Sequence, residues 1–510
     1  MKRSVKTVFW IYTLLFFLII ANLIKISVFD KDKIINNPYN PRVSNSSQTI
    51  KRGSILDSKE RAVAETVRVD DPDDPLGRGY HYERAYRYAR AFAHITGYTG
   101  NGKTGVESEY NYILETVSNE LYQNLAFVLS DKDICGNDAV LTIDADLQVY
   151  AAQQLGSAKG AVVALEPDTG KILTMVSYPN FDPNTISADW SALNSDTENS
   201  PLMSRAAQGL YPPGSTFKII TATSALENDS SLLNYQYTCY GEDDFDGKTL
   251  HCFNSISHGS EDMNNAFAVS CNTYFAEIGM KLGAAKLRKT AEDFFTDINF
   301  PLEYSKPLFS LTEESPVHEL VDTSIGQGKT LVSPLFMAMT AGAVANNGTM
   351  MQPYILDHSI NNFGFAENKT IPQKLTQAMP PEQARQVTEL MKQVTEYGTA
   401  TDADFYVRGR NENDTAVSDS ALSSSAIENE YTGDDTFASA NPVTGYVKVA
   451  GKTGTAENSG GADHAWFVAF APADNPRIAI AVLLENAGKG SKAIPIARNV
   501  MQYYFTNCYY

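Results

Sequence analysis

Cysteine and histidine are scarce in this chain, whose 510 residues include five cysteines and seven histidines. So few cysteines do not hold a fold together by disulfides, and their odd number leaves at least one unpaired. Cys239 and Cys252 bracket a short acidic segment and can pair in an oxidising compartment. No cysteine–histidine cluster has the spacing of a zinc site, so we expect no metal and no cofactor, and treat His258 as a local hydrogen-bonding group.

Positive charge is also in short supply. The chain has 41 Lys and Arg residues against 60 Asp and Glu residues, a net charge of −19. Because such a chain has little to neutralise phosphates with, this balance excludes nucleic acid as a partner. The length exceeds that of one core, and a hydrophobic content of 43% supplies enough apolar material for two or three domains.

Long apolar runs are missing except near the amino terminus. Residues 8–24 are apolar, follow Lys2, Arg3 and Lys6, and are not succeeded by a small-x-small cleavage site. We therefore expect residues 1–29 to form a cytoplasmic tip and an uncleaved single-pass transmembrane helix. Basic residues ahead of the run place the amino terminus in the cytoplasm and the rest of the chain outside it.

The chain after this anchor divides at about residue 137. Residues 30–136 read as a linker and a mixed, non-catalytic domain with helices at 80–95 and near 110–129. Beyond it, strands are predicted at 138–144, 160–165, 172–176, 446–450, 465–470 and 478–484, with helices at 146–155 and 491–505 and mostly helix and loop over 218–344. Strands at both ends with helices between predict an α+β domain over 137–510. Residues 401–444, acidic and without apolar periodicity, are predicted to be a flexible insertion.

A Ser-x-x-Lys motif supplies the first candidate chemistry. Two prolines and a glycine precede Ser215, and good helix formers follow it, so Ser215 and Lys218 are expected on one face of a helix start. A serine hydroxyl becomes a nucleophile when a neighbouring base takes its proton, and a lysine amine at this spacing is within reach. By itself, the motif also fits an ordinary exposed helix face.

Two further motifs complete a known order. Ser-x-Asn begins at Ser270 within a predicted helical stretch, 264–279, and Lys-Thr-Gly begins at Lys452 after the predicted strand 446–450. Ser-x-x-Lys, Ser-x-Asn and Lys-Thr-Gly in this order are the signature of penicillin-binding proteins and class A β-lactamases. Each motif alone is weak, but all three in sequence form a strong signal.

The catalytic roles follow from the residue types. Ser215 attacks a carbonyl carbon and becomes an acyl-ester, and Lys218 acts as its base, which requires a lowered pKa. Ser270 relays a proton toward the leaving amine. Asn272 holds both Lys218 and the substrate amide.

The third motif is expected to bind substrate. Lys452 supplies positive charge, and the hydroxyls of Thr453 and Thr455 bind a substrate carboxylate. Gly454 leaves room for a ligand backbone along the strand edge. The backbone N–H groups of Ser215 and Thr455 are expected to form the oxyanion hole.

With these motifs in place, the chain resembles the class B penicillin-binding proteins, the monofunctional, membrane-anchored peptidoglycan D,D-transpeptidases of bacteria. The resemblance covers nearly the whole chain after the anchor and rests on residues 52–57, 105–111, 213–218, 258–259, 325–328, 345–348 and 465–467 in addition to the three motifs. It implies a transpeptidase domain, an antiparallel sheet flanked by helices, above an N-terminal pedestal domain and a single transmembrane helix. The pedestal is short for the class, and residues 401–444 are longer than the usual connection.

The resemblance also implies substrates and partners. The donor is the D-Ala-D-Ala end of a peptidoglycan stem peptide, the acceptor is an amine on a neighbouring strand, and β-lactams acylate Ser215. A SEDS-type membrane glycosyltransferase is the implied partner at the bacterial cell membrane. The role in division, elongation or sporulation, the acceptor amine and the oligomeric state stay open.

Four alternatives remain open at this point. A serine β-lactamase would need a dedicated deacylating glutamate, and no matching motif supplies one. A β-lactam sensor needs more membrane spans. A D,D-carboxypeptidase would use the same serine with water as acceptor. A non-catalytic scaffold of the cell-wall machinery would not need the intact motifs.

Overall fold

The computed structural model describes residues 2–25, 51–72, 79–115, 135–407, 445–458 and 460–509. It separates into two compact units. Unit 1 comprises Met1–Leu141, Phe181–Ala192 and Leu356–Thr370, and unit 2 comprises Thr142–Asn180, Leu193–Ile355 and Ile371–Tyr510. The single predicted boundary at residue 137 did not anticipate the two later segments that return to unit 1.

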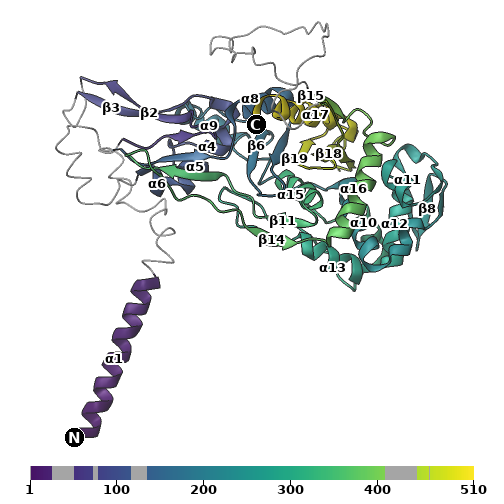
Figure 1. Cartoon of the computed structure of the whole chain (residues 1–510), viewed down its shortest axis with the longest axis horizontal. Helices are drawn as coiled ribbons and strands as arrows, with labels where there is room; N and C mark the ends of the chain where they lie inside the picture. Colours follow the sequence, from purple (N-terminus) through teal and green to yellow (C-terminus); the bar gives the residue numbers. More distant parts are fainter. Residues whose placement is uncertain are drawn as a thin grey trace. The chain divides into compact units, whose positions relative to one another are not determined.

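The described chain begins with α1, Lys2–Ile24, a helix of 23 residues (Figure 1, purple). Large apolar side chains such as Trp10 and Phe16 are exposed on it. Among the residues described by the structure, none of the helices reaches the combined length and hydropathy of a membrane span.

Unit 1 is built on a six-stranded sheet with the strand order β13-β12-β4-β1-β2-β3. Its strands are β1 Ile55–Leu56, β2 Ala62–Asp70, β3 Tyr80–Tyr86, β4 Asp138–Leu141, β12 Leu356–Ile360 and β13 Ala366–Glu367. Four short helices follow β3: η2 Ala89–Ala91, α4 Ala93–Thr96, α5 Gly105–Glu109 and α6 Asn111–Glu115. A fifth helix, α9 Ile186–Ser195, belongs to unit 1 up to Ala192.

The predicted helix at 80–95 is wrong. Residues 80–86 form β3, which pairs antiparallel with β2 from Tyr80 opposite Asp70 to Tyr86 opposite Ala64. Tyrosine favours a pleated surface, and pairing with an adjacent strand outweighs a weak helical periodicity. Only the short turns of η2 and α4 are helical here. Of the second predicted helix, near 110–129, α6 covers the start, and residues 116–134 lie outside the described residues.

A buried ion pair joins the two segments of unit 1 that carry the pedestal resemblance. The fully buried Glu107 carboxylate accepts from Arg52 Nε at 2.6 Å and from Arg84 Nε at 2.7 Å. Burial by itself raises the pKa of Glu107, but the two guanidinium charges outweigh burial and hold that pKa below its usual value. A Cβ atom on Gly53 would lie 1.9 Å from the Asn137 carbonyl oxygen, so glycine is required for this close approach.

Unit 2 contains a five-stranded antiparallel sheet with the order β17-β18-β19-β5-β6. Its strands are β5 Gly160–Leu165, β6 Ile172–Tyr178, β17 Ala450–Ala456, β18 His464–Ala471 and β19 Ile478–Leu484. The early hairpin β5–β6 thus completes a sheet whose other strands come from the end of the chain. β5 and β19 coincide with their predicted ranges, and the predicted α+β class is confirmed.

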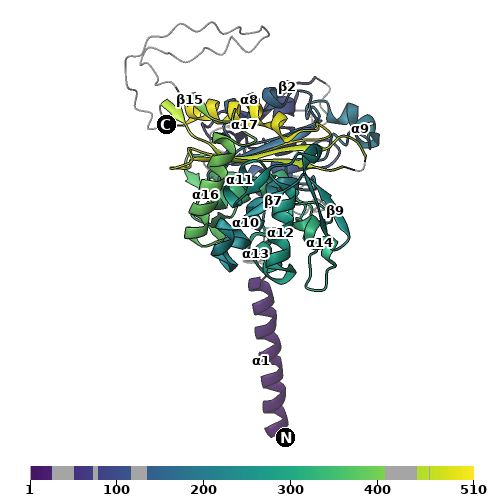
Figure 2. The same cartoon turned by 90° about the vertical axis from the view of Figure 1, so that its right-hand side faces the viewer.

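Helices cover both faces of this sheet (Figure 2). On one side lie α8 Ala145–Leu155 and α17 Ile494–Tyr503. On the other lie α10 Lys218–Asn228, α11 Met263–Ala268, α12 Asn272–Leu282, α13 Ala284–Phe294, α14 Val317–Ser324, α15 Pro334–Ala345 and α16 Pro381–Glu396, with α15 directly against β19. The strands β5, β18 and β19 are buried along their whole length, as expected for a sheet covered on both faces.

Smaller strands and short helical segments complete unit 2. They are β7 Tyr237–Cys239, β8 Glu242–Phe245, β9 Lys248–His251, β10 Gly259–Glu261, β11 Thr349–Met351, β14 Lys374–Gln377, β15 Phe405–Val407, β16 Gly445–Val447, η3 Gly214–Phe217, η4 Ser230–Asn234, η5 Phe253–Ser255, η6 Gly490–Ala493 and η7 Tyr504–Cys508.

The predicted single strand at 446–450 is two strands. β16 pairs with β15, and the chain then turns before β17, so the Lys-Thr-Gly motif lies inside β17 rather than after a strand. The Asp404 carboxylate accepts the Val449 N–H at 2.8 Å, which removes that donor from strand pairing. β15 also shows that the predicted insertion at 401–444 begins with a strand, and residues 408–444 lie outside the described residues.

Candidate active site

The candidate nucleophile lies at a tight junction of three chain segments. Ser215 belongs to η3, a 3₁₀ turn that runs directly into α10. Gly214 has φ +53°, and its N–H donates to the Gly326 carbonyl at 2.8 Å. A Cβ on Gly214 would lie 2.6 Å from the Thr455 carbonyl oxygen, and one on Gly326 would lie 2.0 Å from the Gly214 oxygen. Glycine at both positions therefore allows η3 to sit against β17.

The Lys218 amine is buried and hydrogen-bonded to the Ser-x-Asn motif. Its Nζ donates to Ser270 O at 2.8 Å, to Asn272 Oδ1 at 2.8 Å and, more weakly, to Ser270 Oγ at 3.3 Å. Burial lowers the pKa of Lys218 to about 8. Among the described residues, the half-buried Ser215 hydroxyl has no hydrogen-bond partner, so the expected Lys218–Ser215 bond is not formed. Three acceptors on the neighbouring motif hold the amine instead, and catalytic hydrogen bonds often shorten only when substrate binds.

The Lys452 amine reaches the Ser270 hydroxyl from β17. Its Nζ donates to Ser270 Oγ at 2.8 Å and to the Thr453 carbonyl at 3.1 Å, and the side chain is fully buried. Burial, with a further contribution from the charge of Lys218, lowers the pKa of Lys452 well below its ordinary value. Ser270 therefore bridges two buried amines, a geometry suited to moving a proton between them.

Ser270 occupies an unusual backbone position. It has φ +62° and follows the last turn of α11, with Ser270 N–H donating to Phe267 O and Cys271 N–H donating to Ala266 O at 3.3 and 2.8 Å. This pair of bonds is the Schellman helix ending, whose left-handed residue is usually glycine. The predicted helical stretch at 264–279 is thus wrong at its centre: the motif lies at the junction of α11 and α12. Residues other than glycine in this left-handed conformation cluster at functional sites.

The two threonines of the third motif lie on an edge strand of the sheet. Among the strands of the described residues, β17 pairs only with β18, so its other edge has no strand partner there. Thr453 Oγ1 lies 2.6 Å from the Thr399 hydroxyl, and Thr455 Oγ1 accepts the Gly490 N–H at 3.2 Å. Thr399 was missed by the sequence analysis because it lies in the loop after α16 and belongs to no motif.

Gly454 also has a packing role that the sequence analysis did not predict. A Cβ at this position would lie 2.9 Å from Thr216 Cγ2 and 3.0 Å from the Pro213 carbonyl oxygen. The missing side chain therefore makes room for the start of η3, not only for a ligand. The Trp466 indole N–H donates to the Pro212 carbonyl at 3.0 Å and fastens the same segment to β18.

The structure thus brings Lys218, Ser270, Asn272 and Lys452 into direct contact and packs the turn that carries Ser215 against β17. A half-buried serine at the start of a helix, a buried lysine one turn later and a hydroxyl bridge to a second lysine define a serine acyl-transfer enzyme of the Ser–Lys type. Lys452 comes from strand β17 of the antiparallel sheet, and the other groups come from the helical layer beside it.

Comparison with known proteins gives the family. The penicillin binding protein transpeptidase domain matches residues 160–502, and the penicillin binding protein A dimerisation domain matches residues 52–139. The chain belongs to the penicillin-binding proteins and, within them, to class B.

Relatives of known name cover nearly the whole chain. The peptidoglycan D,D-transpeptidase PbpA of Mycolicibacterium smegmatis is 32% identical over 98% of both chains. A ceftriaxone acyl-enzyme complex of penicillin-binding protein A from M. tuberculosis superposes with a TM-score of 0.74 at 28% identity, covering 90% of this chain and 99% of that one. The D,D-transpeptidase domain of a peptidoglycan glycosyltransferase from Eggerthella lenta gives a TM-score of 0.72 at 30% identity, covering 89% and 98%.

Proposed function

We propose that this chain is a peptidoglycan D,D-transpeptidase that works through an acyl-ester on Ser215. The observation that carries the proposal is the buried network in which Ser270 Oγ contacts both Lys218 and Lys452, beside the turn that presents Ser215. The named activity of the PbpA relatives and the β-lactam acyl-enzyme structures of the M. tuberculosis protein support it.

The proposed acylation uses these groups in turn. Neutral Lys218 takes the Ser215 proton as Oγ attacks the carbonyl carbon of the penultimate D-Ala. The backbone N–H groups of Ser215 and Thr455 stabilise the oxyanion. Ser270 passes a proton to the departing nitrogen, the peptide bond breaks, and D-Ala leaves as a free amine.

Deacylation reverses the same steps with a different amine. An amino group of a neighbouring stem peptide attacks the ester carbonyl and loses its proton to Lys218, and Ser215 Oγ leaves reprotonated. In the earlier acylation step, the terminal carboxylate of the donor peptide binds Thr453, Thr455 and Lys452. Its negative charge raises the pKa of Lys452 again, so the amine becomes fully charged when its anion arrives.

The cellular setting is part of the proposal. We place α1 in the bacterial cytoplasmic membrane as a single-pass anchor, with the amino terminus cytoplasmic, the two units outside, and a SEDS-type glycosyltransferase as partner. The exposed apolar side chains of α1 and the basic residues ahead of them support the anchor. The intact chain should stay in the membrane fraction after a high-salt wash, and a chain without residues 1–29 should not. Release of the intact chain by salt would contradict the anchor.

Labelling with a fluorescent penicillin tests the enzyme assignment. The chain should form a stable adduct on Ser215, and Ser215→Ala should form none while retaining its unfolding temperature. Adding a D-Ala-D-Ala donor peptide and an amine acceptor should then yield the cross-linked product. Hydrolysis without cross-linking would indicate a carboxypeptidase, an adduct that decays within minutes would indicate a β-lactamase, and a folded protein without any adduct would indicate a scaffold.

A further inference from the structure

The Thr399 hydroxyl reaches the substrate-binding strand β17 from outside the three motifs. Thr399 Oγ1 lies 2.6 Å from Oγ1 of Thr453, the threonine of Lys-Thr-Gly, although the two residues are 54 positions apart. Thr453 is buried, with 7% of its surface exposed, whereas Thr399 is exposed. We propose that Thr399 is a positioning residue: it donates its proton to Thr453, so that the Thr453 hydroxyl donates to the terminal carboxylate of the donor peptide. This role rests on the proposed transpeptidase function.

The direction of the hydrogen bond follows from the number of protons available. A hydroxyl group has one proton to donate, and its oxygen also accepts. An ionised carboxylate only accepts, so Thr453 can bind it only with its single proton turned toward the substrate. The bond between the two threonines must then take its proton from Thr399. In the opposite direction Thr453 would present a lone pair to the carboxylate, and two acceptors facing each other repel.

The contacts around Thr453 leave this task to Thr399. Within the described ranges, Thr399 is the one residue hydrogen-bonded to Thr453 Oγ1. Lys452 Nζ donates to the carbonyl of Thr453 and to Ser270 Oγ instead. Because Thr399 is exposed, water can donate to its oxygen while it donates to Thr453, and hydrogen bonds in such a chain strengthen one another.

The turn after α16 that carries Thr399 is also fixed by its backbone. The Thr399 N–H donates to the Ala268 carbonyl at 3.1 Å, and Ala268 is the last residue of α11, two positions before Ser270. The preceding residue, Gly398, allows this approach, because a Cβ there would lie 2.3 Å from the Ala268 oxygen. One short turn therefore contacts the helix end before Ser-x-Asn through its backbone and Lys-Thr-Gly through a side chain.

A purely structural tether is the competing interpretation, and Thr395 supplies the control for it. Thr395 lies in the last turn of α16, and its Oγ1 donates to the Val449 carbonyl at 2.6 Å, one residue before β17 begins. Both threonines thus fasten the end of α16 to the start of β17, but of the two only Thr399 contacts a hydroxyl assigned to substrate binding. If tethering were the whole role, removing either hydroxyl would have the same effect.

Acylation of the full-length chain by a penicillin and by its methyl ester tests the role. The penicillin carries a charged carboxylate, and the ester masks it. In Thr399→Val, the second-order rate constant for the penicillin should fall about tenfold, chiefly through weaker binding before acylation, because a hydrogen bond to a charged group is weakened. The rate constant for the ester should stay near that of the parent. Thr399→Ser should restore the parent rate with penicillin, and Thr395→Val should keep the parent's preference for the free carboxylate.

A double-variant cycle distinguishes positioning from a direct contact with substrate. If Thr399 acts through Thr453, the chain that carries both Thr399→Val and Thr453→Val should be acylated no more slowly than Thr453→Val alone. A further loss of about tenfold in the double variant would show that Thr399 acts independently of Thr453, which would overturn the positioning role.

Two other results would also overturn the positioning role. One is equal penicillin acylation of the parent and Thr399→Val at matched unfolding temperatures, and the other is an equal loss with the penicillin and its ester. Should valine unfold the chain, Thr399→Ala makes the same comparison with Thr399→Ser. A folded parent chain that forms no adduct is a different result, since it would overturn the proposed function on which the role of Thr399 depends.

Discussion

At the scale of single residues, the proposed chemistry depends on the proton held by Lys218. Burial lowers the pKa of this amine to about 8, so the neutral form that can act as a base grows as pH rises toward that value. The rate constant of penicillin acylation should therefore rise about tenfold per pH unit well below pH 8 and level off above it. Stopped-flow labelling across this range measures the profile. A flat profile between about pH 6 and pH 9 would contradict the role of Lys218 as base.

Ser270 offers a second test, because its hydroxyl should affect acylation and its left-handed backbone should affect stability. Ser270→Ala and Ser270→Gly both remove the bridge between the lysines, so acylation should fall by about 10²-fold or more in each. Glycine, however, relieves the left-handed backbone at φ +62°, and the glycine variant should unfold with about 1 kcal/mol more free energy than the alanine variant. Denaturant titration and labelling rates give the two readouts. Equal stability of the two variants would show that the backbone is not strained.

At the scale of elements, the position of Ser215 depends on glycines that let backbones meet. In Gly326→Ala, the new Cβ would lie only 2.0 Å from the Gly214 carbonyl oxygen. This clash should push η3 away from β17. Gly364→Ala is a matched control, since φ is +81° there and +78° at Gly326, but nothing lies within 4 Å of its Cβ. Both variants should lose about 1 kcal/mol through backbone strain. Only Gly326→Ala should lose about 1–3 kcal/mol more through the clash, together with most of its acylation rate.

Several elements show where local sequence patterns predict secondary structure correctly and where they fail. The buried strands β5 and β19 were predicted with correct bounds because continuous apolar runs between turn residues have few alternatives. The strand β3 was predicted as a helix because its partner β2, which fixes its conformation, cannot be read from residues 80–86 alone. The junction of α11 and α12 was missed because Ser270 occupies the left-handed position at the end of α11. Glycine is the usual residue there, and its absence left no sequence signal for the helix end.

At the scale of the whole molecule, the proposed chemistry is confined to unit 2, and unit 1 has its own buried ion pair. Glu107→Gln leaves Arg52 and Arg84 without their shared carboxylate and should cost about 3–5 kcal/mol. Because the pKa of Glu107 is lowered in the folded state, its contribution is present above the unfolded pKa and is lost as pH falls through the folded value. The difference between parent and variant should therefore shrink in acid. Calorimetry at two pH values measures it, and penicillin labelling should be unchanged in the variant at neutral pH. A loss of labelling in a folded variant would show that the chemistry is not confined to unit 2.

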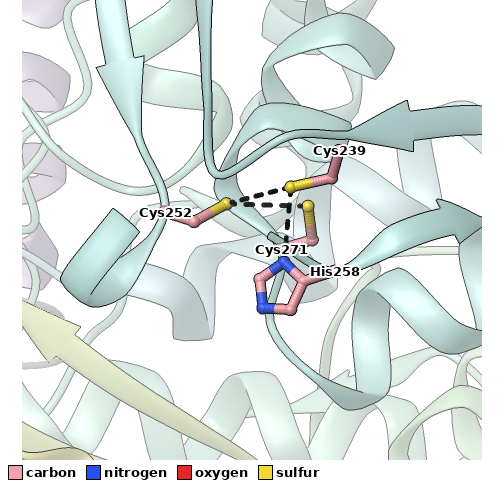
Figure 3. Close-up of side chains that lie close together, drawn as sticks. All are labelled: Cys239, Cys252, His258 and Cys271. Atoms are coloured by element: carbon pink, nitrogen blue, oxygen red, sulfur yellow. Dashed lines mark hydrogen bonds between the residues drawn. The ribbon is translucent and has the colours of Figure 1, made fainter. Parts of the chain in front are cut away.

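The sequence by itself determined the three motifs, their order and the α+β class, because each motif is defined by residue types at a short spacing along the chain. The tertiary structure alone decided which groups meet. Lys218 and Lys452 converge on Ser270 only because β17 and α10 are brought together, and Thr399 reaches Thr453 from a loop without a motif. Cys239, Cys252, His258 and Cys271, whose spacing along the chain predicted no metal-ligand cluster, meet because four turns fold onto one point (Figure 3). Contacts between residues far apart in sequence depend on the packing of whole elements, and no local pattern encodes them.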